Sequence, residues 1–460
     1  MPDTAKTNDF ITRLFINHLC DEYRKHNFID PKFYKDDDVK RGLRNANGTG
    51  VIAGLSQIGD VVGYKLVDGE RIPVPGELYY RGYKLTDLID GFTKENIYGF
   101  EEVSYLLLFG HLPTRDELNF YFETMGALRT LPEHYLQSEI IGSPSPDIMN
   151  KMARLTLGLY SFDESPDDTS LENLMRQGMA LIARFPTLLA YSYQAKRYFY
   201  DKKSLYLHFP HDNQSTAESI LRVVRSNKQF TPEEAKLLDL LLVIHAEHGG
   251  GNNSAFTCRV VSSSGTDTYA AVASALCSLK GPLHGGANIR VMEMFEDIKA
   301  NAGNWHNENV VADYLTKMLK KEAGDRSGLI YGLGHPIYTL SDPRAVILKE
   351  NARRLAEEKG FGEEFKLAET IERIAPELMK SVRGITKPIC ANVDFYSGLV
   401  YKTLDIPVEL YTPLFACARI AGWIAHRIEE ISTNARIIRP AYRVVYDQQP
   451  YVNIDERTTM

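Results

Sequence analysis

Helical spacing of apolar residues is the feature that most constrains this chain. From Tyr83 onward apolar side chains recur with the period of a helix rather than alternating. The run 231–234, Thr-Pro-Glu-Glu, supplies an N-cap, a proline at the first helical position and a capping-box glutamate. The apolar run 237–244 follows, and the glycines 249–251 are expected to stop that helix. The pattern predicts a mainly α fold of many helices packed in layers.

Two further helices can be placed from local signals. Residues 269–280 are rich in Ala and Ser, which predicts a closely packed, central helix that Gly281-Pro282 ends. Asp342-Pro343 is expected to begin another helix, which Gly360 ends. Before this helical region, residues 1–45 are polar and charged and predict a helical arm. Short alternating runs between residues 49 and 83 predict small β-hairpins near the N-terminus.

Composition excludes several classes of protein. With 44% apolar and 25% charged residues, the 460-residue chain resembles an ordinary folded protein rather than a disordered one. A net charge of -7 gives no reason to expect binding to nucleic acid or to an anionic membrane, and no apolar run has membrane-spanning length. The acidic N-terminal region is unlike a targeting segment. Five scattered cysteines without a CxxC pair indicate a reducing compartment, so we expect the cytoplasm.

Three glycine-punctuated segments, 281–288, 334–344 and 392–398, carry the residues best suited to chemistry. Together they present two imidazoles, a carboxylate and an arginine on turns, which is the equipment of carbonyl acid/base chemistry. These residues are His284, His335, Asp394 and Arg344.

Each of these residues also has a structural interpretation. His284 could cap the helix that ends before it, but four small neighbours favour close approach of a ligand to the imidazole. Asp394 could cap a helix that begins near Ser397. Alternatively, its apolar neighbours could desolvate the carboxyl group, raise its pKa and make it a stronger base.

The arginines also leave alternatives open. Arg344 falls in the first turn of a helix, where the macrodipole disfavours a cation, which indicates either a ligand anion or a surface ion pair. Arg419 is alone in an apolar helix, so it is expected to be buried with an anionic partner, either structural or a ligand. Arg439 precedes Pro440, and its local sequence predicts only an ordinary exposed arginine.

A metal site is the alternative use of the histidines. His245 and His248 are spaced i,i+3, which differs from the i,i+4 spacing of the HExxH motif, and neither the cysteines nor a carboxylate pair completes a ligand set. We therefore predict no metal, and interpret His245 as a packed helix histidine. The chain also lacks a GxGxxG or P-loop motif, so no dinucleotide or nucleoside triphosphate is indicated.

These segments, in this order, resemble citrate synthase from about Gly76 to Pro440. The resemblance implies a large helical domain, residues 1–288 and 404–460, and a smaller mobile domain, residues 289–403, that closes over the substrates. It implies a Claisen-type condensation of acetyl-CoA with oxaloacetate, followed by hydrolysis to citrate and CoA. CoA then enters as the acyl-thioester substrate, and no bound cofactor is implied.

The resemblance also implies roles for single residues. Asp394 removes the methyl proton of acetyl-CoA, His284 donates to its thioester oxygen, and His335 polarises the ketone of oxaloacetate. Ser254 orients His284. The substrate-binding residues carried over are His248, Asn252, Arg344, Arg419 and Arg439. In the family the last arginine comes from the other subunit, which implies a homodimer or a higher homo-oligomer.

The chain departs from the family near its CoA site. Pro336, Thr339 and Leu340 occupy a stretch where basic residues are common, and Ile289 stands where many members have an acid. The residues that hold the CoA phosphates are therefore not assigned. Three other functions stay open: a 2-methylcitrate synthase that uses propionyl-CoA, a metal-dependent hydrolase, and a non-catalytic paralogue that binds CoA or dicarboxylates. One methyl group separates the first from the main interpretation, a difference of about 1–3 kcal/mol in binding.

Overall fold

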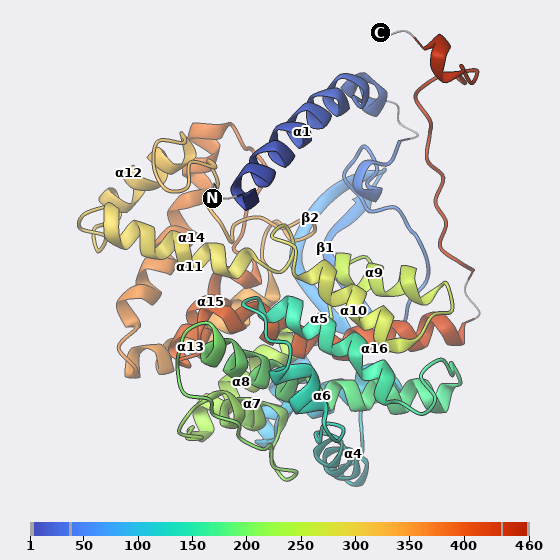
Figure 1. Cartoon of the computed structure of the whole chain (residues 1–460). Helices are drawn as coiled ribbons and strands as arrows, with labels where there is room; N and C mark the ends of the chain where they lie inside the picture. The colour runs from blue at the N-terminus through green and yellow to red at the C-terminus, as the bar shows by residue number, and fades with distance from the viewer. Residues whose placement is uncertain (1–3, 36–38, 434–435, 458–460) are drawn as a thin grey trace. The chain divides into compact units, whose positions relative to one another are not determined.

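The computed structural model describes residues 4–35, 39–433 and 436–457 (Figure 1). The chain divides into two compact units, one formed by residues 1–53 and 439–460, the other by residues 54–438. The boundaries predicted at residues 289 and 403 both lie inside the second unit, and that division stays a prediction.

The first unit contains one long helix, α1 (Thr4–His26), and short helical turns at 31–35, 41–43 and 454–456. Arg44 and Gly50 form an antiparallel bridge within it. The predicted N-terminal arm is thus helical over Thr4–His26. Residues 36–38, which belong to the predicted arm, lie outside the described residues.

The second unit begins with an antiparallel sheet of β1 (Gly59–Val67), β2 (Glu70–Tyr80) and β3 (Tyr83–Lys84), in that order. Both hairpin loops are two residues long, since Val67 pairs with Glu70 and Tyr80 with Tyr83. All four loop residues have positive φ, as the tight turns of twisted hairpins require. The prediction of hairpins in this region is confirmed.

The rest of the second unit is helical, which confirms the mainly α fold. Short helical turns lie at 136–141, 159–162 and 408–410. The long helices are α2 (Leu85–Glu95), α3 (Gly99–Phe109), α4 (Arg115–Ala127), α5 (Ile148–Gly158), α6 (Leu171–Phe199), α7 (Thr216–Val224), α8 (Pro232–His245), α9 (Asn253–Ser262), α10 (Thr268–Leu279), α11 (Ala287–Asn301), α12 (Glu308–Leu319), α13 (Pro343–Glu358), α14 (Gly362–Arg383), α15 (Val393–Thr403) and α16 (Tyr411–Ser432).

The core of this unit is built around α16, which is buried along most of its length and packs against α3, α6, α8, α9 and α10. The Ala- and Ser-rich α10 packs against α5, α9 and α16, as its small residues predict. Helices α11 to α15 contact one another through the pairs α11–α15, α12–α14 and α13–α15. None of the helices in the described ranges is both long and apolar enough to cross a bilayer.

Helix α8 begins as predicted but ends earlier than expected. Thr231 caps it in a complete capping box with Glu234, and Pro232 is its first residue. The helix ends at His245, several residues before the glycines that were expected to stop it. Side chains take its last carbonyls: the Tyr80 hydroxyl donates to Val243 O (3.0 Å) and Arg419 Nε donates to His245 O (2.6 Å). Packing against other elements therefore ends this helix.

Candidate active site

Two segments that are far apart in the chain meet at the centre of the site. Leu333 and Ala391 form an antiparallel bridge, and the Gly334 N–H donates to Cys390 O (2.8 Å). Gly332 and Gly334 have φ of +78° and +93°, values that favour glycine. This pairing brings the loop that carries His335 next to the start of α15.

The first turn of α15 holds Asp394, but Asp394 does not cap it. Asn392 is the N-cap: its Oδ1 accepts from the Asp394 N–H (3.0 Å), while its Nδ2 donates to Gly334 O (3.0 Å). The alternative in which Asp394 caps a helix near Ser397 is therefore wrong. The amide of Asn392 can both cap the helix and bond the paired loop, which a carboxylate cannot do.

The carboxyl group of Asp394 is poised as a base. Burial raises its pKa to about 6, although the nearby guanidinium groups of Arg344 and Arg419 pull it down. The helix N-terminus also favours the ionised form. Within the described residues, no hydrogen bond to the carboxyl oxygens of Asp394 is seen, so they remain able to accept a proton from a bound molecule.

Asp342 joins the starts of two helices. Its Oδ1 caps α13 by accepting from the Arg344 N–H (3.0 Å), and its Oδ2 accepts from the Val393 N–H (3.2 Å) at the start of α15. The same carboxylate also receives Arg344 Nε (3.0 Å) and Nη2 (2.7 Å). Both residues are at least 97% buried, at 1% and 3% exposure, so the alternative of a surface ion pair is wrong. The ion pair is local and buried, which overcomes the unfavourable dipole that the sequence indicated.

His335 has a defined tautomer. Its Nδ1 accepts from the backbone N–H groups of Ile337 and Tyr338, both at 3.1 Å. A backbone N–H can only donate, so Nδ1 is unprotonated and Nε2 carries the hydrogen of the neutral ring. The ring stacks on Tyr338 at 4.6 Å and lies edge-on to His248 at 5.3 Å. His335 can therefore act as a hydrogen-bond donor through Nε2.

The sheet supports the His335 loop from the other side. The Gly76 N–H donates to Ser341 Oγ (3.1 Å), and the Tyr338 hydroxyl donates to Glu77 O (3.4 Å). A Cβ at Gly63 would lie 2.6 Å from Ile337 O, so only glycine lets the strand approach this closely. The small N-terminal sheet thus has a structural role at the site.

His284 lies just past the end of α10 and contacts the start of α9. The Ser254 N–H donates to His284 Nε2 (3.3 Å), and the Ser254 hydroxyl lies 3.0 Å from the same atom. Nε2 is thus an acceptor, which leaves the hydrogen on Nδ1. Burial, together with the charge of Arg419, lowers the pKa of His284 to about 4, so the ring is neutral near pH 7.

The glycines beside His284 serve the protein's own packing. The Gly285 N–H donates to Leu279 O (3.0 Å), and a Cβ at Gly285 would overlap that carbonyl and approach the Leu279 side chain. A Cβ at Gly286 would lie 3.3 Å from Pro282. The expectation that these glycines open space for a ligand is wrong for Gly285, because the end of α10 fills that space.

Arg419 is fully buried, and among the described residues no anion forms a direct ion pair with it. Its Nε donates to His245 O, but within the described ranges neither Nη1 nor Nη2 has a hydrogen-bond partner. Burial lowers its pKa to about 10, against the raising effect of Glu247. His248 Nε2 is likewise buried without a partner among the described residues, and burial lowers the pKa of His248 well below its usual range. The charge of Arg419 helps to lower the pKa of both His248 and Asp394, so its guanidinium lies near enough to act on each of them.

The remaining predicted residues differ in their surroundings. Asn252 precedes α9, and its Oδ1 accepts from the Ser254 hydroxyl (3.0 Å). His245 is fully buried, packs against Phe415 (4.4 Å between rings) and donates through Nδ1 to Leu241 O (2.8 Å), as a packed histidine does. Arg439 is exposed and belongs to the first unit, so its role at the site stays a prediction.

Comparison with known proteins shows the family of this chain. The family model described as citrate synthase, C-terminal domain, matches residues 46–441. The chain belongs to the citrate synthase family. The resemblance and the mainly α fold predicted from the sequence are thereby confirmed.

Relatives in the citrate synthase family carry two names. The citrate synthase of Synechocystis sp. is 36% identical over 387 residues, which cover 83% of this chain and 88% of the relative. The 2-methylcitrate synthase 1 of Corynebacterium glutamicum is 32% identical over 430 residues, 92% of this chain and 100% of the relative. A solved structure of Thermoplasma acidophilum citrate synthase, in a ternary complex with carboxymethyl coenzyme A and oxaloacetate, has a TM-score of 0.74 at 26% identity and covers 92% of this chain and 100% of its own.

Several residues of the candidate site were not identified as such from the sequence. Tyr338 stacks on His335 and lies 5.6 Å from the His248 ring. Asp342 was predicted only as a helix cap. Tyr80 holds the end of α8. A tyrosine or an aspartate gives no local signal of such a role, because each depends on what packs against it.

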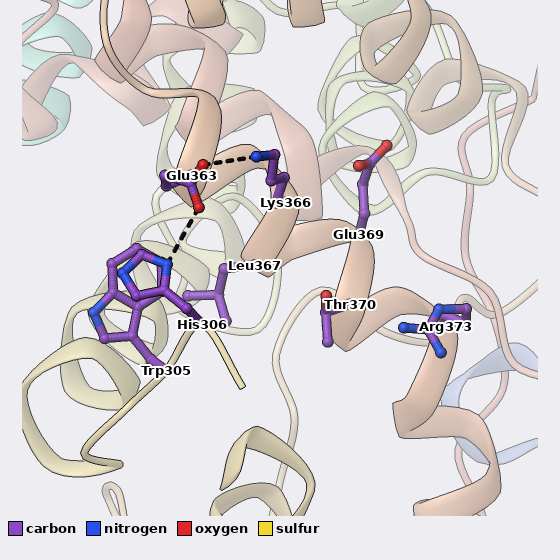
Figure 2. Close-up of a pocket in the computed structure, with 8 residues that line it drawn as sticks. All are labelled: Trp305, His306, Glu363, Lys366, Leu367, Glu369, Thr370 and Arg373. Carbon is purple, nitrogen blue, oxygen red and sulfur yellow. Dashed lines mark hydrogen bonds and ion pairs between the residues drawn. The ribbon is translucent and has the colours of Figure 1, made fainter. Parts of the chain in front are cut away.

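A separate cavity of about 350 Å³ lies beside α14 (Figure 2). None of the predicted site residues lines it, and its charges are paired within the protein: Glu363 with Lys366 and with His306, and Arg373 with Glu308. Across the part of the chain that the structure describes, no three His, Cys, Asp or Glu side chains are grouped so that they could hold a metal ion.

Proposed function

We propose that this protein condenses acetyl-CoA with oxaloacetate to form citrate and CoA. The observation that carries the proposal is Arg419, whose two terminal nitrogens are fully buried and without a partner in the described residues. A buried guanidinium whose terminal N–H groups lack acceptors is costly, and a substrate carboxylate would supply those acceptors.

Oxaloacetate then binds among the buried polar groups around Arg419. Its carboxylates face Arg419, Arg344 and the unpartnered Nε2 of His248, with Asn252 close by. The ketone oxygen accepts from His335 Nε2–H, which polarises the carbon under attack and supports the developing alkoxide.

Acetyl-CoA is activated from the other side of the site. His284 Nδ1–H donates to the thioester oxygen, and Ser254 holds the ring in the tautomer that makes this possible. Asp394, with a pKa of about 6, accepts the methyl proton as the enol or enolate forms. Both histidines act as neutral donors, so the proton goes to Asp394, whose carboxyl oxygens accept no hydrogen bond within the described residues.

The bond-forming step joins the two substrates. The enol carbon attacks the polarised ketone carbon, forms a new C–C bond and leaves an alkoxide that takes up a proton. Water then cleaves the thioester of citryl-CoA, which releases citrate and the CoA thiol. Closure of residues 289–403 over the substrates would keep the enolate from water, and the contacts among α11 to α15 support treating them as one body.

The assembly and location form part of the same proposal. We infer a homodimer in which the partner supplies the exposed Arg439, and a cytoplasmic location, which the five free cysteines support. Light scattering on a size-exclusion column tests the dimer. Loss of activity in Arg439→Ala, restored by mixing with the inactive Asp394→Asn protein, tests the donation across subunits.

Release of CoA thiol from purified protein given oxaloacetate tests the activity, with acetyl-CoA and propionyl-CoA in parallel. Preference for acetyl-CoA supports the citrate reaction. Preference for propionyl-CoA favours the second candidate, 2-methylcitrate synthase. A relative of that name at 32% identity is the observation that supports this candidate. If folded protein released thiol from neither substrate, the catalytic proposal would be refuted.

A further inference from the structure

A chain of ionisable side chains lies behind the oxaloacetate-binding groups. Glu247 Oε1 accepts from His426 Nε2–H (2.9 Å) and from the Gly249 N–H. His426 Nδ1 accepts from Arg259 Nε (3.1 Å), which fixes the neutral tautomer because a guanidinium can only donate. Arg259 is in turn paired with Glu430 (2.6 Å) and with a second glutamate of α16.

The second carboxyl oxygen of Glu247, Oε2, is not used in this chain of hydrogen bonds. The residue is fully buried, and Oε2 has no hydrogen-bond partner in the described part of the chain. Two glycines make room for this carboxylate: a Cβ at Gly422 would overlap Oε2, and a Cβ at Gly59 would lie 2.8 Å from Glu247 Cγ. The unpartnered oxygen thus lies close to the backbone of α16 at Gly422.

This position is one helical turn from Arg419. Gly422 follows Arg419 by three residues on α16, so the two lie on neighbouring parts of one helix face. Arg419 Nε also donates to His245 O, two residues before Glu247. Glu247 and Arg419 are therefore a buried anion and a buried cation beside each other, each with unpartnered polar atoms and without a direct ion pair.

We propose that Glu247 is the resident counter-ion of Arg419. As a positioning residue held by His426, it compensates the charge of Arg419 before the substrate arrives, and thereby limits how tightly oxaloacetate binds. The inference rests on the proposed function, because it takes the arriving anion to be a carboxylate of oxaloacetate.

The direction of the effect separates this role from a merely structural one. Without the charge of Glu247, Arg419 in the unliganded protein would be uncompensated, and a bound carboxylate would become its counter-ion. The unliganded state would lose more stability than the complex, so oxaloacetate would bind more tightly. If Glu247 only held the turn that carries His248, its loss would loosen the site and weaken binding.

The test is Glu247→Gln, which keeps the shape and removes the charge, with oxaloacetate affinity measured by calorimetry. We expect a roughly tenfold lower Kd, about 1.4 kcal/mol, and a lower KM for oxaloacetate, as removal of one nearby charge implies. The matched control is Glu430→Gln, which removes a buried charge from the same chain of residues at its far end and should leave Kd unchanged. An unchanged or higher Kd in Glu247→Gln, or an equal decrease in the control, overturns the proposal.

If Glu247→Gln is too unstable for calorimetry, its unfolding midpoint in urea can be measured with and without oxaloacetate instead. The counter-ion role predicts that saturating oxaloacetate raises the midpoint of Glu247→Gln more than that of the wild type, or recovers folded variant on refolding. Failure of oxaloacetate to do either contradicts it. The wild-type protein distinguishes the two proposals: if it binds no oxaloacetate, the proposed function fails, whatever Glu247 does.

Discussion

Replacement of Asp394 by Asn should make the protein inactive and more stable at once. Asp394 is the proposed base, so removing it should lower turnover by about 10²- to 10⁴-fold, the usual contribution of general acid-base catalysis. The same carboxylate is ionised near neutral pH in a partly buried place, which costs folding free energy. An amide of the same shape removes that cost.

The magnitude follows from the pKa. A shift from 3.8 to about 6 on folding corresponds to about 3 kcal/mol at pH 7.5. The favourable interaction of a carboxylate with the first turn of α15 is lost as well, about 0.3–1 kcal/mol, and the residue is partly exposed. We therefore expect Asp394→Asn to gain about 2 kcal/mol at pH 7.5.

The stability gain of Asp394→Asn should depend on pH in a direction set by the raised pKa of Asp394. Because the folded pKa is raised, the penalty is absent below the unfolded pKa of 3.8 and grows until the pH passes about 6. The stability gain of the variant should therefore vanish as the pH falls from 7.5 to about 4. Over the same range, kcat/KM of the wild type should fall about tenfold per unit below pH 6.

Urea denaturation of both proteins between pH 4 and pH 8, beside assays of thiol release, measures both effects. Asp394→Glu is the control, since it keeps the charge and should show no stability gain. A stability difference that did not change with pH would refute the electrostatic reasoning. Near-normal turnover in Asp394→Asn would refute the assignment of the base.

Four other predictions follow from single contacts. Arg419→Lys should raise the KM for oxaloacetate about 10- to 100-fold, because it loses the planar fork, and an unchanged KM in steady-state assays would contradict carboxylate binding there. Gly332→Ala should lower kcat and stability together, since its Cβ would lie 2.7 Å from Phe395 at a φ of +78°. Gly360→Ala, at a φ of +84° in open space, is the control that should lose stability and keep kcat. Thr231→Ala should cost about 1 kcal/mol in urea denaturation with unchanged turnover, and a neutral result would mean that the capping box of α8 adds nothing. Turnover should survive EDTA treatment, and loss restored by added Zn²⁺ would instead favour the hydrolase alternative.

Elements with strong local signals were predictable because the signal and the structure lie within a few residues. The capping box of Thr231 and Glu234, the Asp342-Pro343 start and hairpins between residues 49 and 83 are all present. The end of α8 was not predictable. It depends on Tyr80 and Arg419, which reach it from a strand and from a helix elsewhere in the chain.

The candidate site likewise has features that could be predicted from local sequence and features that depend on tertiary contacts. His284, His335 and Asp394 could be selected from their glycine-rich surroundings and from the resemblance. The tautomers of the two histidines could not, because they depend on N–H groups of Ser254 and Tyr338 placed by the fold. Asn392 was overlooked as the cap of α15, because Asn and Asp both cap helices and only the pairing with residues 332–334 decides between them.

The helices, the hairpins and the types of residue available for acid/base chemistry could be predicted from the chain, since these follow from periodicity and from near neighbours. Which charges have partners is set by tertiary packing. Asp342 is neutralised by Arg344 and by two backbone N–H groups, whereas Asp394, two residues beyond the cap of α15, keeps its oxygens for a proton. Arg419 is left with two bare nitrogens in the core. Whether a buried charge is partnered depends on groups that packing brings together from distant parts of the chain, and that is why only the folded protein shows where an anionic substrate fits.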